Sequence, residues 1–147
     1  MTTSTEHCID VCNRLLRGER SAVETYDKAI EKYGDKPVLE GLNRIRSEHA
    51  AAVSELEANV RSMGGEPETD SGAWGTLANT VQSTANLFGA GSALEALESG
   101  EQMGVTDYKA ALEDDEVMPG CKDLIRGTLL PLTEAHIAEL KMLQQAA

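Results

Sequence analysis

The chain has 147 residues, of which 13 are basic and 25 are acidic, so its formal net charge is −12. An acidic surplus of this size disfavours nucleic acids and anionic membranes as partners, because both are recognised by basic patches. Hydrophobic residues make up 41% of the chain but aromatic residues only 3%, which favours an aliphatic core between packed helices. The length is sufficient for one domain with a core of its own.

The amino-terminal residues and the cysteines favour a cytoplasmic location. Residues 1–7 contain neither the basic segment nor the apolar core of a secretion signal, and no apolar run approaches the roughly 20 residues of a membrane span. The three cysteines are an odd number, which favours free thiols in a reducing compartment. Cys8 and Cys12 lie one helical turn apart, but no further Cys or His completes a zinc spacing, so we interpret them as small core residues.

Two long amphipathic helices are predicted in the first half of the chain. Apolar residues recur at intervals of three and four over residues 4–33 and again over residues 37–63, which is the spacing of a helix with one buried face. Residues 34–37 between them contain a glycine suited to a helix end and a proline suited to a first turn. Because this link is so short, the two helices are expected to be antiparallel neighbours in a hairpin of residues 4–63.

A crossover and a second hairpin are predicted in the second half of the chain. Residues 64–91 begin with a glycine-rich break, and a weak helical pattern within them, at residues 73–88, predicts a short crossover helix. Periodic apolar residues then return and predict a second hairpin over residues 92–146. Its two helices are expected at residues 92–114 and 119–145. Pro131 lacks a backbone N–H, so we expect a kink there.

The two hairpins carry the same residue types at matching positions. In each first helix a Gly-Glu pair is followed, seven residues after the Glu, by a tyrosine. Each second helix has a histidine in the middle of its apolar face. The matching pairs are Gly18/Gly100, Glu19/Glu101, Tyr26/Tyr108 and His49/His136. This duplication predicts a single all-α domain, an up-down four-helix bundle built from two pseudo-symmetric helical hairpins.

One polar side chain from each long helix is expected in the centre of this bundle. Glu19, His49, Glu101 and His136 each lie on an apolar face near the middle of a helix, so they should converge at one level of the core. A buried carboxylate without a partner is costly. Two carboxylates and two imidazoles together are the donor set of a transition-metal site. These four residues are therefore the candidate ligands of one iron, manganese or zinc ion.

The Gly-Glu and Tyr signatures, the Gly-Gly-x-Pro break at residues 64–67 and the hairpin–crossover–hairpin layout resemble ferritin-like and rubrerythrin-type four-helix proteins. Within that superfamily the chain is most similar to the bacterial domain of unknown function 2383 family. The resemblance implies that Glu19 and Glu101 are metal ligands. It also implies that His49 and His136 belong to the Glu-x-x-His pairs of the second and fourth helices, which complete a di-iron site in that superfamily.

Two positions depart from that ligand pattern. Arg46 and Thr133 stand three residues before the two histidines, where the resemblance implies carboxylates. Arg46 is expected to reach Glu19 or Glu101 and to place a fixed cation where a metal would otherwise balance the charge. Two interpretations follow. One is a degenerate site in a non-catalytic structural or stress-associated module without a cofactor, and the other is a protein that binds one transition metal and has weak oxidoreductase activity.

The surroundings of the candidate site are also predicted. The residues expected around the four central side chains are Tyr26, Tyr108, Arg46 and Thr133. Glu48 and Glu134 adjoin the histidines in sequence but are rotated from them by roughly 100° and 200° about the helix axis, so we interpret them as poor substitutes for the missing carboxylates. No catalytic residue is assigned by any pattern in the sequence. A homodimer formed through the outer helix faces is left open.

Overall fold

The structure is a computed structural model that describes residues 4–33, 38–70 and 90–146. Within these ranges the chain is all-α and contains no β-strand, as the sequence predicts. The elements are α1 (Ser4–Tyr33), α2 (Val38–Ser62), α4 (Ala90–Glu113), α5 (Pro119–Leu124), the π-helical turn η1 (Ile125–Leu129) and α6 (Leu130–Ala146). The expected crossover helix at residues 73–88 and the link at residues 34–37 lie outside the described residues.

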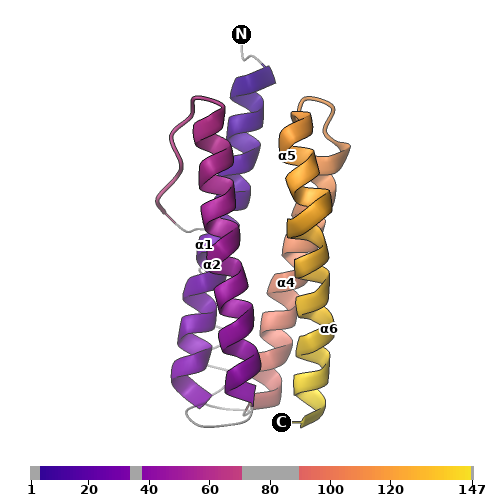
Figure 1. Cartoon of the computed structure of the whole chain (residues 1–147). Helices are drawn as coiled ribbons and strands as arrows, with labels where there is room; N and C mark the ends of the chain where they lie inside the picture. Colours follow the sequence, from indigo (N-terminus) through magenta and orange to yellow (C-terminus); the bar gives the residue numbers. More distant parts are fainter. Residues whose placement is uncertain (1–3, 34–37, 71–89, 147) are drawn as a thin grey trace.

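Four long rods lie side by side in the described part of the chain (Figure 1). Helix α1 runs downward in that view and α2 returns upward, so they form an antiparallel pair. Helix α4 also runs upward, and α5, η1 and α6 continue one another downward as the fourth rod. The α1–α2 pair contacts the pair formed by α4 and the fourth rod in two places, through α1 against α4 and through α2 against α6.

The interior consists of two apolar layers with polar side chains between them. The upper apolar layer, near the start of α1, consists of Cys8, Val11, Cys12, Leu15, Leu16, Ala52, Leu56, Val60, Tyr108, Ala111, Val117, Cys121, Ile125 and Leu129. The lower apolar layer consists of Ala22, Tyr26, Ala29, Val38, Leu42, Ile45, Ala93, Leu94, Leu97 and Leu140. In α1 the upper layer ends at Leu16 and the lower begins at Ala22, with buried Glu19 between them. Burial of each large aliphatic side chain contributes about 1.5–3 kcal/mol, so both layers hold the rods together.

The apolar periodicity predicted the first three rods to within two residues at each end, and α1 has the predicted bounds. The fourth rod is interrupted, as expected from Pro131, but the interruption is the π-helical turn that ends just before Pro131. The proline ring cannot approach the carbonyl of Gly127 four residues earlier, and a wider turn relieves this conflict. The extra residue rotates the rest of the rod by about 100°. Beyond this turn Thr133 is buried, whereas the neighbouring Leu132 is half-buried.

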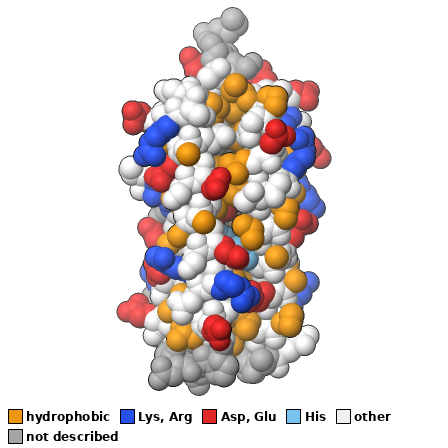
Figure 2. All heavy atoms as spheres, in the orientation of Figure 1, with side chains coloured by type: hydrophobic (Ala, Val, Ile, Leu, Met, Phe, Trp, Pro, Cys, Tyr) orange, Lys and Arg blue, Asp and Glu red, His pale blue; other side chains and the backbone are white. Residues whose placement is uncertain are grey.

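The surface of the described residues mixes charges of both signs. Figure 2 shows acidic and basic side chains interspersed over one face rather than gathered into a basic patch. Within the described ranges, no helix has the length and hydropathy needed to cross a membrane.

The start of α1 is tied to the turn that follows α4. The Nε2 atom of His7 lies 2.6 Å from a carboxylate oxygen of Asp114 and 3.9 Å from one of Glu116. The hydrogen bond to Asp114 raises the pKa of His7, and the same bond lowers the pKa of Asp114. The acidic turn is therefore paired with a histidine of α1.

This pair predicts a pH dependence of stability. His7 binds its proton more tightly in the folded chain, so its contribution is complete below its ordinary pKa of 6.5 and is lost as the pH rises through the raised value. Asp114 contributes above its ordinary pKa of 3.8, and this contribution is lost as the pH falls through the lowered value. In Asp114→Asn, an NMR titration should show the pKa of His7 returning toward 6.5. Asp115→Asn, at an exposed neighbouring position, is the matched control; an unchanged His7 pKa in Asp114→Asn would contradict the pairing.

Candidate functional site

The four side chains that the sequence singled out meet between the two apolar layers. Glu19 comes from α1, His49 from α2, Glu101 from α4 and His136 from α6, and their exposed fractions are 6%, 3%, 0% and 3%. The helical periodicity that carries the apolar residues inward also carries these four inward. Each rod thus contributes one titratable side chain to the same level of the core.

Glu101 is the centre of this cluster. Its Oε1 atom lies 2.6 Å from Nε2 of His49 and 2.9 Å from Nδ1 of His136, and it accepts a hydrogen bond of 3.2 Å from the hydroxyl of Tyr26. Its second oxygen, Oε2, is buried and has no hydrogen-bond partner among the described residues. The Oε1 atom of Glu101 therefore contacts three neighbouring side chains, and the Oε2 atom remains available to coordinate an ion.

His49 joins the two acids. Its Nδ1 atom lies 2.5 Å from Oε2 of Glu19, while its Nε2 atom faces Glu101. Both ring nitrogens thus face carboxylates, which favours the doubly protonated imidazolium. Burial opposes this charge, but Glu19 and Glu101 outweigh burial and raise the pKa of His49 well above its ordinary value.

The same contacts shift the pKa values of Glu101 and of the two buried tyrosines. Burial alone would raise the pKa of Glu101, but the charge of His49 and the hydrogen bonds from His136 and His49 lower it to about 2. Burial and the neighbouring carboxylates raise the pKa of Tyr26 and Tyr108 well above 10.0. Both hydroxyls therefore remain protonated and act as hydrogen-bond donors to the acids.

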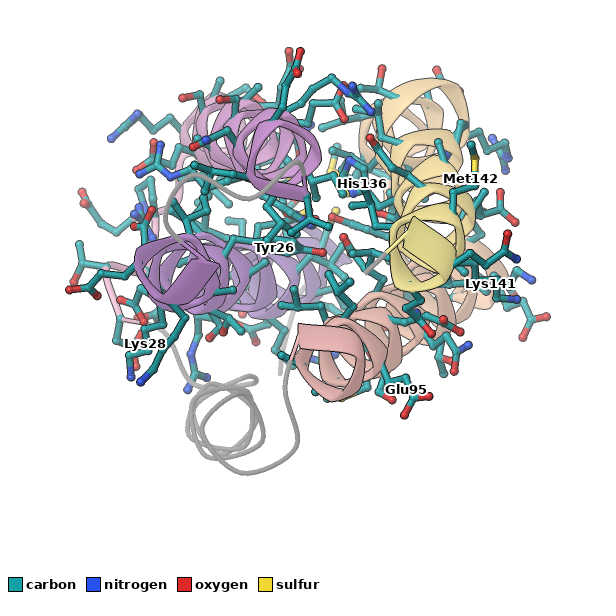
Figure 3. The ribbon with its side chains drawn as sticks, turned by 90° about the horizontal axis from the view of Figure 1, so that it is seen from below. Tyr26, Lys28, Glu95, His136, Lys141 and Met142 are labelled. Carbon is teal, nitrogen blue, oxygen red and sulfur yellow. The ribbon has the colours of Figure 1, made fainter. Side chains whose placement is uncertain are left out.

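The two tyrosines cross between the helix pairs. Tyr26 of α1 donates to Glu101 of α4, and Tyr108 of α4 donates to Glu19 of α1. This reciprocal pattern explains why the Glu-to-Tyr spacing occurs twice in the sequence. In Figure 3, seen along the bundle, Tyr26 and His136 lie inside the ring of helices, whereas Glu95 lies outside.

Glu48, which we interpreted as a poor substitute for a missing carboxylate ligand, contacts the cluster from its edge. Its Oε1 atom lies 2.8 Å from Nε2 of His136, and its side chain is 34% exposed. Glu48 does not turn toward the histidine next to it in sequence but reaches the histidine of the opposite helix pair. Gly41, which closely approaches Leu143, begins the line along α2 that faces α6 and includes Glu48. That spacing from Gly41 to Glu48 was the available sequence signal.

Arg46 lies outside the cluster, so the expectation that it reaches Glu19 or Glu101 is wrong. Its Nε atom donates to Asp27 at 2.8 Å, and its side chain is 38% exposed. Because Asp27 is an exposed residue of α1, the guanidinium finds its partner at the surface without losing its hydration. The described residues therefore place no arginine cation between the acids.

Thr133 is buried beside the cluster but does not bond to it. Its hydroxyl donates to the backbone carbonyl of Leu129 at 2.8 Å. Thr133, together with Gly18 and Gly104, lines a cavity of about 20 Å³ that also touches Glu19, His49 and Glu101. A cavity needs roughly 10–15 Å³ to hold one water molecule. The space beside the acids is therefore large enough for a single small ligand.

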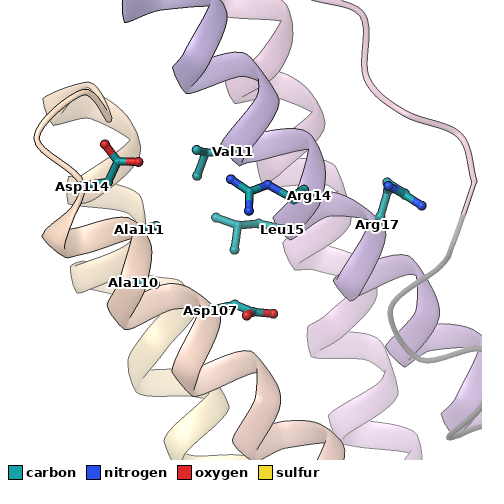
Figure 4. A pocket seen from close by; sticks show the side chains of 8 residues that line it. All are labelled: Val11, Arg14, Leu15, Arg17, Asp107, Ala110, Ala111 and Asp114. Atoms are coloured by element: carbon teal, nitrogen blue, oxygen red, sulfur yellow. The ribbon is translucent and has the colours of Figure 1, made fainter.

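A surface groove adjoins this cavity. The groove has a volume of about 520 Å³ and lies between α1 and α4 (Figure 4). Leu15 and Asp107 line both the groove and the inner cavity, so the two spaces share part of their lining. Arg14 and Arg17 line the α1 side of the groove.

The fold and the cluster define a class of protein: an all-helical chain whose rods are joined in the core by a carboxylate–imidazole network. The family model described as domain of unknown function (DUF2383) matches residues 7–114, and the chain belongs to this family. This result confirms the membership of the domain of unknown function 2383 family that the sequence predicted. The matched span contains Glu19, His49 and Glu101, whereas His136 lies beyond it. Neither the comparison with curated proteins nor the comparison with solved structures found a match.

Glu101→Gln tests whether the cluster holds the rods together. The substitution removes the charge that faces both histidines, so the free energy of unfolding should fall by about 3–5 kcal/mol. Urea denaturation followed by circular dichroism measures this change. Glu95→Gln makes the same chemical change at an exposed position of α4 and should shift stability by less than about 0.5 kcal/mol. Equal effects of the two substitutions would show that the central carboxylate does not stabilise the fold.

Proposed function

We propose that this protein is a ferritin-like metal-binding module that holds one divalent transition-metal ion, iron, manganese or zinc, in the central cluster. The observation that carries the proposal is the buried Oε2 atom of Glu101, which has no partner among the described residues although two imidazoles lie beside the same carboxylate. A buried carboxylate oxygen without a hydrogen bond is costly. A cation would remove that cost.

The donor set suits such an ion. The donor atoms of His49, Glu101 and His136 all lie within 4.8 Å of one another. Imidazole and carboxylate are common ligands of divalent transition metals. We assign these three residues as direct ligands. Glu19, which contacts the opposite nitrogen of His49, stays a fourth candidate ligand.

In each histidine, the ring nitrogen that faces away from Glu101 contacts a carboxylate, as is usual for histidines that bind a metal. Glu19 lies against Nδ1 of His49, and Glu48 lies against Nε2 of His136. A histidine that binds a metal usually gives its other ring nitrogen to a carboxylate or carbonyl, which fixes the orientation of the ring. The two acids thus leave one nitrogen of each imidazole directed at Glu101. Binding of a metal ion would release the protons that those nitrogens now share with Glu101.

The position of Arg46 supports the metal-binding proposal over the degenerate site. The degenerate-site interpretation rested on two missing carboxylates and on a guanidinium near the acids, and the second of these grounds is removed because Arg46 pairs with Asp27 at the surface. A transition metal held here would supply Lewis acidity and, for iron or manganese, one-electron chemistry. The latter would be the source of the weak oxidoreductase activity that belongs to this alternative.

A structural module without metal is the second candidate. The observation in its favour is that His49, as an imidazolium, contacts both Glu19 and Glu101 and already offsets one of their two negative charges. In this case the network serves only to fix the register of the rods, as buried polar groups do in some proteins. The two candidates differ in one measurable respect, which is whether divalent metal binds at the centre.

Metal content and metal affinity distinguish the two candidates. Protein expressed in medium supplemented with iron, manganese and zinc, and purified without chelator, should carry about one of these ions per chain by elemental analysis. Calorimetric titration of the metal-free chain should show one site, and saturation at 100 times the Kd should add about 2.7 kcal/mol to the free energy of unfolding. Absence of both effects would contradict the metal-binding proposal and favour the structural module without metal.

Two variants locate the site. Glu101→Gln and His49→Gln should each weaken metal binding at least 10–100-fold, which is the loss typical of ligands and their immediate partners. Glu95→Gln, at an exposed position of α4, should bind as the wild type does. Circular dichroism establishes that each variant is folded before the titration. Undiminished affinity in both central variants would place any bound ion elsewhere in the molecule.

We also propose the finer architecture that the sequence predicted, two pseudo-symmetric hairpins joined in a ferritin-like bundle. The reciprocal bonds of Tyr26 to Glu101 and of Tyr108 to Glu19 support it. A cytoplasmic location and a homodimer formed through the outer faces stay predictions from the sequence. Sedimentation analysis decides the second of these.

A further inference from the structure

All three cysteines of the chain meet in the upper apolar layer. Cys8 and Cys12 belong to α1 and Cys121 belongs to α5, and each is at most 1% exposed. Their sulfur atoms all lie within 4.8 Å of one another. Cys121 is 109 residues from Cys12 in the chain, so tertiary packing alone brings the third sulfur to the pair on α1. The three residues form no disulfide.

Polar contacts converge on these sulfur atoms within an otherwise apolar layer. The Sγ atoms of Cys12 and Cys121 are 2.8 Å apart, and Cys12 donates to Oδ1 of Asn59 at 3.4 Å. Cys8 accepts a hydrogen bond of 3.3 Å from the backbone N–H of Met118. An ordinary buried cysteine behaves as a small apolar residue. Here the three sulfurs lie close to one another and contact two further polar groups, as the ligands of a metal ion would.

We propose that Cys8, Cys12 and Cys121 form a second metal site, a three-thiolate site for one Cu(I) ion. Thiolate is the ligand class that selects soft cations such as Cu(I), whereas oxygen ligands suit magnesium, calcium and manganese. Structural zinc sites almost always use four strong ligands, and this group contains three sulfurs with no imidazole or carboxylate among its members. The three-sulfur composition therefore favours Cu(I) over zinc.

The geometry accommodates the ion with little movement. Three sulfurs at about 2.3 Å from one ion stand about 4 Å apart, and all three sulfurs are already within 4.8 Å of one another. The 2.8 Å separation of Cys12 and Cys121 has to increase. Each thiol that binds gives up its proton to solvent, and the ion offsets one of the resulting negative charges. Met118, whose backbone N–H bonds to Cys8, is 38% exposed, so the turn that contacts the cysteines reaches the surface.

This site is separate from the central cluster. The cysteines lie in the upper apolar layer, whereas Glu101 and the two histidines lie between the layers. The two sites also differ in donor chemistry, with sulfur alone in one and nitrogen and oxygen in the other. Variants of one site are therefore expected to leave metal binding at the other unchanged, and either proposal can fail without the other.

Anaerobic titration of the fully reduced chain with Cu(I), in competition with a chromophoric Cu(I) chelator, tests the site. One Cu(I) per chain is expected, with X-ray absorption showing a first shell of sulfur alone. Cys12→Ser and Cys121→Ser should each lower the affinity at least 100-fold, and Glu95→Gln, at an exposed position of α4, should leave it unchanged. Failure of the wild type to compete with the chelator, a first shell containing nitrogen or oxygen, or displacement of Cu(I) by equimolar Zn²⁺ would overturn the proposal. The X-ray absorption measurement uses the wild type, so it decides the matter even where a serine variant does not fold.

Discussion

The placement of one imidazole between two buried carboxylates is the constraint on which the rest of the structure depends. His49 of α2 contacts Glu19 of α1 through one nitrogen and Glu101 of α4 through the other. A buried charge without a partner costs several kcal/mol, so none of the three helices can slide along its axis without losing a partner. Glu101 extends the same constraint to the fourth rod by accepting from His136. The charged network thus fixes a register that apolar contacts alone would specify less sharply.

The division of the interior into layers separates two kinds of chemistry. Nitrogen and oxygen donors lie at mid-height, sulfur donors lie in the upper layer, and the described lower layer contains apolar side chains and the ring of Tyr26. Each set of donors is surrounded by aliphatic residues, which lower the local dielectric and strengthen whatever electrostatic contact is made there. Hard and soft cations would therefore meet different ligands in one small bundle. The apolar layers serve both sets by excluding water from them.

Sequence reasoning succeeded for features set by one helix and failed for features set by two. The inward direction of Glu19, His49, Glu101 and His136 followed from their spacing relative to apolar neighbours, and the structure brings all four together. The partner of Arg46 could not be read in the same way, because its long side chain reaches either the core or the surface from one backbone position. Asp27 decided that choice from another helix.

By itself the sequence determined the all-α class, the bounds of α1 and the family, because the turn of a helix is a local property that repeats every 3.6 residues. Tertiary structure decided which side chains meet across helices. It placed Glu48 against His136 and brought Cys121 to Cys12. It also converted the break before Pro131 into a π-helical turn that buries Thr133. These contacts depend on the direction, register and separation of neighbouring rods, and no periodicity within a single rod contains that information.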